Sequence, residues 1–550
     1  MKRQKFSFIL WVILTFFHIA PTYAQVNSWN WARSGTGNGS VEGSTVTSDP
    51  FGNIYVSGYY SSENMTIGSV TLQNLGLSFN DGFLAKYDPS GNFLWAQRFG
   101  GSGNDRGTSI ATDKAGNVYL TGYFYSPKIG FGKDTLINAG NVGDIFIVKY
   151  DSSGKVLWAK REGAAALEIP HAIHVDGNNN VIVAGRFSSN SITFGTTTLL
   201  LAGSMDVFIA KYDALGNLLW AKGAGGGSND EAYSISSDPS GNIYLAGYFT
   251  QPSNFGTIKL TSAGISDMFL AKYDPSGNVL WAKNAGGKGD DRATGLQTDA
   301  SGNSYIAGYF TNDAISFGSI VVPNRPGDNS FLAKYDTNGN VLWANGVGGD
   351  SQALDLAVFN DNVYACGSFQ ADTLTYGTTN LIINGNSDFF LLNCDTNGKP
   401  KWAIKQTSDG ESGEIARSVA TDPSGNVIVT GLFGSEPITF GNSGISSVRG
   451  FNMFVAKLGS TPTGIADLQN SSDLIVYPNP CNGHFILKSA HAIKTIEVYT
   501  VSGSKIYTHD PTKERGSVEI DISSFPSGVY IVSLFDGKKR YTEKMVKSEN

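Results

Sequence analysis

Cysteine is scarce in this chain: Cys366, Cys394 and Cys481 are the only three among 550 residues. A disulfide framework is excluded, because a chain of this length can bury an ample core without covalent staples. Cys366 and Cys394 fall in the same repeat, on strands that we expect to be neighbours. Whether they form a disulfide stays open, since adjacency alone does not satisfy the geometry of the bond.

Positive charge is also limited. Lys and Arg number 40 against 47 Asp and Glu, which gives a formal net charge of -7. An acidic chain without a basic stripe is a poor partner for phosphate backbones, so nucleic acid is disfavoured as a ligand.

Long hydrophobic runs are missing except at the N-terminus, where Lys2, Arg3 and Lys5 precede an apolar run over 6–20 and small residues lie at Thr22 and Ala24. This layout predicts a secretory signal peptide over residues 1–24. The alternative is an uncleaved anchor helix, but the run is shorter than the ~20 residues that a bilayer span needs. We therefore expect no transmembrane span in the mature chain, whose net charge would be -10 because three positive charges leave with the signal.

Glycine is abundant at 67 residues, while Tyr and Phe number 24 and 32 and Met only 6. Many tight turns between short aromatic-rich strands produce this balance, and long helices do not. Tryptophan gives the period, because seven Trp-Ala pairs recur at intervals of 59 to 64 residues. They begin at Trp31, Trp95, Trp158, Trp220, Trp281, Trp343 and Trp402. Such regular spacing indicates one supersecondary unit of about 62 residues stacked on itself.

Each unit contains four short strands joined by glycine-containing turns, as residues 107–160 show. Seven such four-stranded units predict a seven-bladed β-propeller over residues 25–460. The last repeat stops one strand short, and the strand at 29–35 can complete its blade and close the ring. A β-solenoid is the alternative fold, although its usual coils are much shorter than this period. The Asp residues of the repeated turns, as in DPSGN at 238–242, are explained by turn chemistry.

The units resemble the SBBP bacterial β-propeller repeats through stretches of the forms DxFLAKYDxxGNxLWA and DxxGNxYxxGYF. The resemblance covers nearly all of residues 26–460. It implies a propeller scaffold and leaves the ligand unnamed.

A linker at 461–473 separates the repeats from residues 474–550, which read as about seven short strands of a small Ig-like β-sandwich. This tail resembles the type IX secretion C-terminal sorting domain of Bacteroidota. The matching residues are Tyr477, Pro478, Asn479, Pro480, Gly528, Tyr530, Lys544 and Lys547. The resemblance implies docking on the type IX secretion machinery after passage through the periplasm, removal of the tail, and a secreted or cell-surface protein. The alternative is a generic Ig-like adhesion domain.

Residues for chemistry are sparse. His171 and His174 are the histidines of the repeat region, and their spacing on a predicted strand places them on opposite faces, so they cannot share a metal. Zinc, calcium-loop and phosphate-loop motifs are missing. The turn aspartates lack the spacing of a sialidase Asp box. We therefore predict no catalytic residue, metal or cofactor.

The connection between the second and third strands of each unit reads as a long loop, as does the connection from one unit to the next. These long, variable connections should share one face of the propeller, where binding specificity usually resides. Strand-end tyrosines, acids in GGxxxD segments and the arginines that follow two of the acids should gather on this face. These candidate ligand-binding residues are Tyr59, Tyr123, Tyr248, Tyr309, Asp105, Asp230, Asp291, Arg106 and Arg292. Aromatic planes beside carboxylates and arginine suit sugar rings. Alternatively, the tyrosines pack between blades and the acids cap loop amides.

Two functions follow from the sequence. The first is a non-catalytic scaffold for binding or adhesion, with a glycan, polymer or protein ligand. The second is a polysaccharide hydrolase or lyase whose carboxylates lie in the loops of the variable face. Two buried acids that face each other across a pocket would favour the enzyme.

Overall fold

The computed structural model describes residues 26–76, 79–140, 142–311, 313–325, 327–408, 413–434, 437–461, 474–500, 505–510, 515–536 and 540–548. The predicted signal peptide lies outside these residues, as does the predicted linker apart from Thr461. The described residues form strands and no helix, so none of them belongs to a helix that could cross a membrane. Ser28–Gly459 form one compact unit, and Ser460–Asn550 belong to a second.

The repeats fold as four-stranded antiparallel sheets with their strands in sequence order, because short turns join neighbouring strands. The first is β2 (Val41–Ser48), β3 (Ile54–Tyr60), β6 (Asp81–Tyr87) and β7 (Phe93–Phe99). Further sheets are β8-β9-β12-β13 (Asp105–Thr112, Val118–Phe124, Asp144–Tyr150, Val156–Glu162), β14-β15-β18-β19 (Glu168–Val175, Val181–Phe187, Asp206–Tyr212, Leu218–Gly226), β20-β21-β24-β25 (Asp230–Ser237, Ile243–Phe249, Asp267–Tyr273, Val279–Ala285), β26-β27-β30-β31 (Asp291–Thr298, Ser304–Phe310, Asn329–Tyr335, Val341–Val347) and β32-β33-β36-β37 (Ser351–Phe359, Asn362–Phe369, Asp388–Cys394, Pro400–Lys405).

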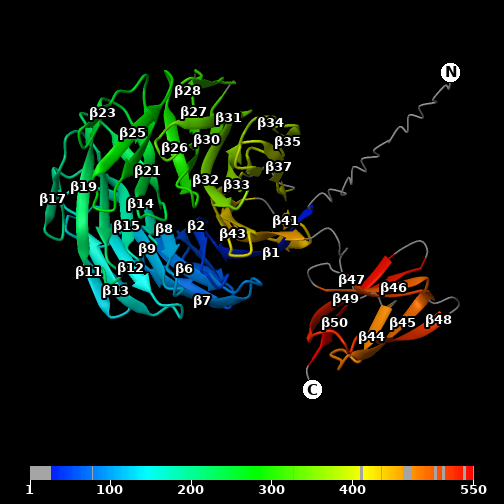
Figure 1. The fold of residues 1–550 in the computed structure, drawn as a ribbon. Coiled ribbons are helices and arrows are strands. Elements are labelled where there is room, and N and C mark those ends of the chain that lie inside the picture. Colours follow the sequence, from blue (N-terminus) through cyan, green and yellow to red (C-terminus); the bar gives the residue numbers. More distant parts are fainter. Residues whose placement is uncertain are drawn as a thin grey trace, which may run out of the picture. The chain divides into compact units, whose positions relative to one another are not determined.

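The last repeat supplies β39 (Glu414–Thr421), β40 (Val427–Phe433) and β43 (Asn452–Thr461), and β1 (Val26–Gly37) pairs beside β43 as the fourth strand. The first strands of consecutive sheets contact one another, and β39 contacts β2. The sheets therefore surround a common axis in the manner of a propeller (Figure 1). Aliphatic side chains at one aligned position of the first strands are buried near this axis. They are Val46, Ile110, Ile173, Ile235, Leu296, Leu356 and Val419.

Each connection between the second and third strands folds into a short hairpin that the sequence analysis left as a loop. The hairpins are β4-β5 (Asn64–Ile67, Val70–Gln73), β10-β11 (Lys128–Phe131, Asp134–Ile137), β16-β17 (Ser191–Phe194, Thr197–Leu200), β22-β23 (Ser253–Phe255, Ile258–Leu260), β28-β29 (Ile315–Phe317, Ile320–Val322), β34-β35 (Thr373–Tyr376, Thr379–Ile382) and β41-β42 (Ile438–Phe440, Ser443–Ile445). Two of them extend the preceding sheet, since β4 pairs with β1 and β22 with β19. The last hairpin forms a separate three-stranded sheet, in which β41 pairs with β38 (Thr407–Ser408).

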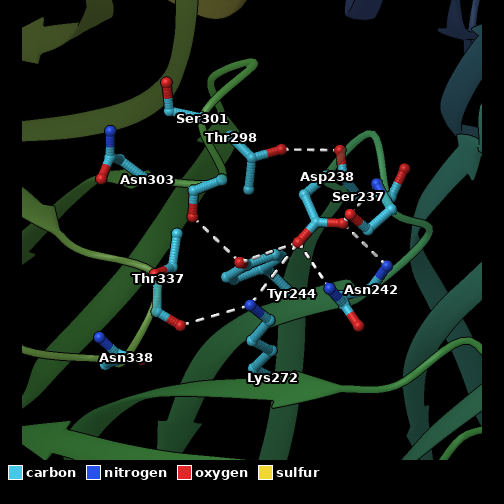
Figure 2. A network of polar contacts seen from close by, with 12 residues as sticks. Ser237, Asp238, Asn242, Tyr244, Lys272, Thr298, Ser301, Asn303, Thr337 and Asn338 are labelled. Atoms are coloured by element: carbon cyan, nitrogen blue, oxygen red, sulfur yellow. Dashed lines mark hydrogen bonds and ion pairs between the residues drawn. The ribbon is translucent and has the colours of Figure 1, made fainter.

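The turn aspartates join neighbouring sheets through buried polar contacts (Figure 2). One oxygen of Asp238 accepts hydrogen bonds from the amides of Ser240 and Asn242, and the other accepts from Asn242 Nδ2 and the Tyr244 hydroxyl. The Tyr244 hydroxyl also lies 3.0 Å from the carbonyl of Gly302 in the next sheet. Lys272 Nζ lies 3.6 Å from Asp238 and donates to the carbonyl of Thr337, also in the next sheet. The repeated Asp therefore fixes both its own turn and the adjacent sheet.

Six of the seven repeat tryptophans, all except Trp402, also bind a turn carbonyl of the neighbouring sheet. Trp281 Nε1 donates to the carbonyl of Thr337, the acceptor that Lys272 also uses. Corresponding Lys and Trp pairs share the carbonyls of Ser152, Ala214, Thr396 and Pro89. The regular Trp spacing thus reflects a contact that recurs between sheets.

All three cysteines are buried and free. Cys366 and Cys394 lie on paired strands, but Cys366 is opposite Leu391 and Cys394 is opposite Val363. Their side chains belong to different hydrophobic clusters, on opposite faces of the sheet.

The C-terminal unit contains two sheets. One is β44-β45-β48 (Leu474–Tyr477, His484–Ala492, Arg515–Asp521), and the other is β47-β46-β49-β50 (Lys505–His509, Thr495–Thr500, Gly528–Phe535, Arg540–Lys547). Both contribute to one core, in which Phe485 and Ile520 of the first sheet share a cluster with Val498 and Leu534 of the second. Cys481 is buried in this core, with Sγ 3.3 Å from the sulfur of Met545.

Candidate functional site

The variable connections and the candidate residues lie at one end of the four-stranded sheets. The first strand begins where the second strand ends, because the two are antiparallel and Asp230 pairs with Phe249. The Asp-containing tight turns, such as the one at Asp238, lie at the other end of these strands. We call the end that carries the start of the first strands the loop end.

The three candidate aspartates are buried at the loop end and bind loop groups. Asp105 accepts from the amides of Gly101, Tyr125 and Ser126 and from the Ser126 hydroxyl. Asp230 accepts from the Gly226 amide at 2.7 Å and from the Ser253 hydroxyl at 2.5 Å. Asp291 accepts from the Gly287 amide at 2.7 Å. These carboxylates hold the loops in place.

Burial raises the pKa of two of these aspartates strongly. The pKa of Asp230 rises to about 6 and that of Asp291 to about 7, since burial outweighs the hydrogen bonds from loop amides. The Oδ1 atom of Asp291 is buried and has no hydrogen-bond partner among the described residues.

The candidate arginines stack on candidate tyrosines. The Arg106 guanidinium lies 4.0 Å from the ring centre of Tyr59, and that of Arg292 lies 4.4 Å from the ring centre of Tyr248. Tyr123 is partly buried and packs edge-on against Tyr125. Cation–π contacts of this kind cover an aromatic face and fix both side chains.

A polar cluster that the sequence analysis did not single out lies among these residues. Glu231 Oε1 is 2.6 Å from His171 Nε2 and 2.7 Å from Arg186 Nε. Its other oxygen accepts from the hydroxyls of Tyr233 and Tyr248 at 3.2 and 3.1 Å. Burial alone would raise the pKa of Glu231, but the hydrogen bond and charge of His171 and the charge of Arg186 outweigh it and lower the pKa to about 2. Glu231 is therefore an ionised structural anchor.

The sequence analysis assumed regular alternation at His171, but a β-bulge recurs at this position in the first strand of each four-stranded sheet. A β-bulge at His171 shifts the register of β14 between Pro170 and Ala172. The bulge turns His171 toward Glu231, while His174 binds the Ser237 hydroxyl at 2.9 Å. The sequence did contain a signal for this cluster. The second position of the first strand carries a charged residue in four repeats: Glu42, Arg106, Glu231 and Arg292.

A hollow of about 300 Å³ opens beside this cluster. Its lining residues come from several sheets and all are partly exposed. They are His171, Tyr233, Thr294, Tyr309, Gln352, Leu354 and Arg417. Of the residues predicted as ligand-binding, Tyr309 lines this hollow. No described lining residue is a carboxylic acid; Glu42, which pairs with Arg417 Nε at 3.3 Å, does not line it.

An adjacent hollow of about 310 Å³ shares Gln352, Leu354 and Arg417 with the first. Its walls include Asp328 and Asp350, and the backbone amide of Asp328 donates to the side-chain Oδ1 of Asp350 at 3.1 Å. The first hollow therefore supplies aromatic rings and a cation, and the second supplies acidic side chains.

The channel along the axis forms a third hollow, of about 250 Å³, lined mainly by small polar and aliphatic side chains. Burial raises the pKa of Asp355 there to about 6 and lowers that of His174 to about 4. Asp355 accepts from the Ser418 hydroxyl and the Val419 amide, so it links two sheets. In the described part of the chain, no group of three His, Cys, Asp or Glu side chains is arranged to hold a metal.

The residues matched to the sorting motif lie in the C-terminal unit. Asn479 Oδ1 accepts from the Val546 amide at 2.9 Å, and the Tyr530 hydroxyl donates to the Pro526 carbonyl at 2.5 Å. Lys547 Nζ donates to the carbonyls of Ser523 and Phe525. The side chain of Lys544 lies outside the described residues. The described contacts tie the final strand to the rest of this unit.

Two family models match the chain. The secretion system C-terminal sorting domain matches residues 475–548, and the SBBP beta-propeller repeat matches residues 94–123. These matches and the recurring four-stranded sheets define the class: a secreted propeller protein. More particularly, the protein carries SBBP-type repeats and a type IX secretion sorting domain, which directs it to the cell surface or the medium.

Curated relatives and a solved structure add little about activity. A WD repeat-containing protein of Acanthamoeba polyphaga mimivirus is 25% identical over 507 residues, which cover 73% of this chain and 36% of that protein. The regulatory protein FlaEY of Caulobacter vibrioides is 24% identical over 313 residues, which cover 52% and 32%. The chain thus spans about a third of the length of these relatives. A copper-bound fungal alcohol oxidase of the AA5 family is 13% identical, with a TM-score of 0.37 and coverage of 95% and 100%.

Proposed function

We propose that the protein is a non-catalytic binding module that recognises a glycan at the loop end of a seven-bladed β-propeller. In this proposal residues 25–460 form the propeller, 461–473 are a linker, and 474–550 are an Ig-like sorting domain. The sorting domain engages the type IX secretion machinery, and the exported propeller serves adhesion or capture at the cell surface.

The hollow at the loop end is the observation that carries the proposal. It joins the rings of Tyr233 and Tyr309 to hydrogen-bonding groups of Thr294, Gln352 and Arg417. Sugars present apolar ring faces and rows of hydroxyls, which aromatic rings and planar donors of this kind recognise.

The contacts behind the hollow support a preorganised site. The Tyr233 hydroxyl also accepts from Arg292 Nη1 at 3.1 Å, and Arg292 is held by Asp290 through an ion pair of 2.8 Å. Groups that are fixed before the ligand arrives lose little conformational entropy on binding. Tyr248 contributes to this support because Arg292 stacks on its ring, and Tyr59 contributes because its hydroxyl donates to Glu42, which pairs with Arg417.

The acids at the loop end support binding over catalysis. A glycosidase of the usual kind needs two carboxyl groups that flank the bond, one of them protonated. Glu231 is held ionised by its partners, and Asp105, Asp230 and Asp291 bind loop groups away from the hollow.

A polysaccharide hydrolase or lyase is the second candidate. Asp328 and Asp350 favour it, because they place two carboxylates on the wall of the adjacent hollow. In that case, Asp350→Asn would abolish chain cleavage while binding persisted.

An array of polysaccharides and host glycans, probed with the full chain, tests the proposal, with cleavage followed in the same wells. We expect specific binding without cleavage. Tyr309→Ala should weaken binding at least about tenfold, as expected for a stacked ring at a binding centre, while Tyr309→Phe retains most of it.

Ser301→Ala provides the matched control, since Ser301 is exposed in a tight turn at the opposite end of the strands. Cleavage that depends on Asp350 would replace the proposal with the enzyme. Binding that is indifferent to Tyr309→Ala would move the ligand away from this hollow.

A further inference from the structure

The hairpin of the second repeat departs from the others at one position. The loop of each hairpin begins with a glycine, which is Gly132 in the second repeat. Two positions before this glycine, the second repeat has Gly130. The other repeats have a polar residue there: Thr66, Thr193, Asn254, Ser316, Thr375 or Thr439. In three hairpins this side chain contacts a polar partner across the strands, as in Thr66–Thr71, Thr193–Thr198 and Thr375–Asn380. Gly130 lies opposite Thr135 and has no side chain to offer.

Open space remains where this side chain would be. A Cβ atom added to Gly130 would meet no atom of the described residues within 4 Å. The space belongs to a hollow of about 660 Å³ between the ends of β7 and the β10-β11 hairpin. Among the described hollows noted above, none is as large, and the volume falls within the range of small-molecule sites.

The walls of this groove are largely apolar. Phe99 is fully buried beneath it, while Leu75 and Ile137 are 50% and 60% exposed. Pro127 completes the apolar lining. Large apolar side chains that stay exposed around one concave surface are typical of a site that another molecule covers.

Two cations stand at the rim. Arg98 is about one-third exposed and lies 3.6 Å from the buried Asp81, a longer ion pair than the 2.9 Å between Arg161 and Asp144 in the next sheet. Lys128 is exposed, and no ion pair to it occurs among the described residues. The groove therefore combines an apolar interior with two cations at its edge, Arg98 in a long ion pair with Asp81 and Lys128 without an ion pair among the described residues.

We propose that this groove binds a small amphipathic anion, a molecule with an aromatic or aliphatic body and one carboxylate or sulfonate group. The body lies against Leu75, Phe99 and Ile137, in the space that Gly130 leaves, and the acidic group pairs with Lys128 and Arg98. The site is separate from the hollow that carries the proposed glycan binding, so either can exist without the other.

Fluorescence titration of the full chain with anilinonaphthalene sulfonate tests the groove. Phenylnaphthylamine, which lacks the sulfonate, serves as the neutral probe. We expect saturable binding of the sulfonate at one site. Gly130→Leu should fill the space and weaken both probes about tenfold, whereas Lys128→Gln should weaken the sulfonate about fivefold and leave the neutral probe unchanged.

Two variants are matched controls. Gly444→Leu adds the same side chain to the hairpin of the last repeat, where an added Cβ also meets nothing within 4 Å. Lys133→Gln removes an exposed charge from the same hairpin outside the groove. Three outcomes would each overturn the proposal. They are an equal loss of probe affinity in Gly130→Leu and Gly444→Leu, an unchanged affinity in Gly130→Leu, and the lack of saturable binding.

Discussion

The aspartates of this protein separate into two groups according to what surrounds each carboxylate. In the tight turns, hydrogen bonds and a lysine outweigh burial and lower the pKa of Asp113, Asp176 and Asp422. At the loop end, burial dominates and raises the pKa of Asp81, Asp230 and Asp291. The same residue type thus has opposite effects on the pH dependence of stability.

Asp291→Asn should make stability less dependent on pH. The folded pKa of Asp291, about 7, exceeds the usual 3.8, so between these values the folded state holds a proton that the unfolded state releases. Its contribution is therefore present at low pH and is lost as the pH rises through about 7. As the pH rises from about 5 to about 8, we expect the free energy of unfolding of Asp291→Asn to increase relative to that of wild type by on the order of 2 kcal/mol.

Urea denaturation at the two pH values measures this difference. Asp313→Asn is the control, because Asp313 is half exposed. A parallel pH dependence in wild type and Asp291→Asn would show that Asp291 is ionised in the folded state throughout this range.

The contacts of individual side chains were the least predictable feature from the sequence. Repetition identified the turn aspartates as structural, while the tryptophans served to establish the period. The contacts of both residue types recur in the same form in one sheet after another. The cluster around Glu231 was missed although polar residues at the second position of the first strands gave a signal, because it depends on the bulge at His171 and on side chains from two sheets. Tyr309 was named from its place at a strand end, which alone cannot show whether a ring is covered.

At the scale of elements, alternation and turn residues predicted the four-stranded sheets well. The hairpins between second and third strands were missed, since their strands have only three or four residues and show little alternation. A signal was nevertheless present: an aromatic or aliphatic residue followed by glycine recurs in every hairpin. Each of these glycines has a φ between 54° and 60°, as the first position of a tight two-residue loop requires.

Gly132→Ala and Gly130→Ala should differ although they lie two residues apart in one hairpin. Gly132 has a φ of 59°, where a Cβ atom is strained, so Gly132→Ala should lower stability by about 1 kcal/mol. Gly130 is in strand β10 without a positive φ and faces open space, so Gly130→Ala should be neutral within about 0.5 kcal/mol. Denaturation followed by fluorescence compares them, and equal losses would contradict this account of the hairpin.

At the scale of the whole molecule, the contacts between sheets continue from the end of the repeat region to its beginning. Lys457 Nζ, in the last repeat, lies 2.7 Å from Asp422 and donates to the carbonyl of Pro89 in the first. Asn393 stands where other repeats carry this lysine, and its amide binds within its own sheet. The neighbouring last sheet receives β1 as its outer strand and so lacks the turn that would accept a lysine.

Lys457→Met should destabilise the repeat region strongly. It removes the partner of a buried carboxylate, which costs about 3–5 kcal/mol when the charge stays behind. Lys288→Met is the control, since Lys288 is 85% exposed and its ion pair with Asp313 should contribute at most about 1 kcal/mol. Tryptophan fluorescence reports on the repeats alone, because residues 474–550 contain no tryptophan. Equal effects of the two variants would contradict closure through this contact.

The central claim is that the loop end binds a glycan and leaves it intact. The crystal structure of the full chain soaked with the strongest array ligand tests this most directly. The account predicts an uncleaved sugar against Tyr233 and Tyr309, within hydrogen-bonding distance of Arg417. A ligand bound at the tight-turn end, or a cleaved product beside Asp328 and Asp350, would contradict it.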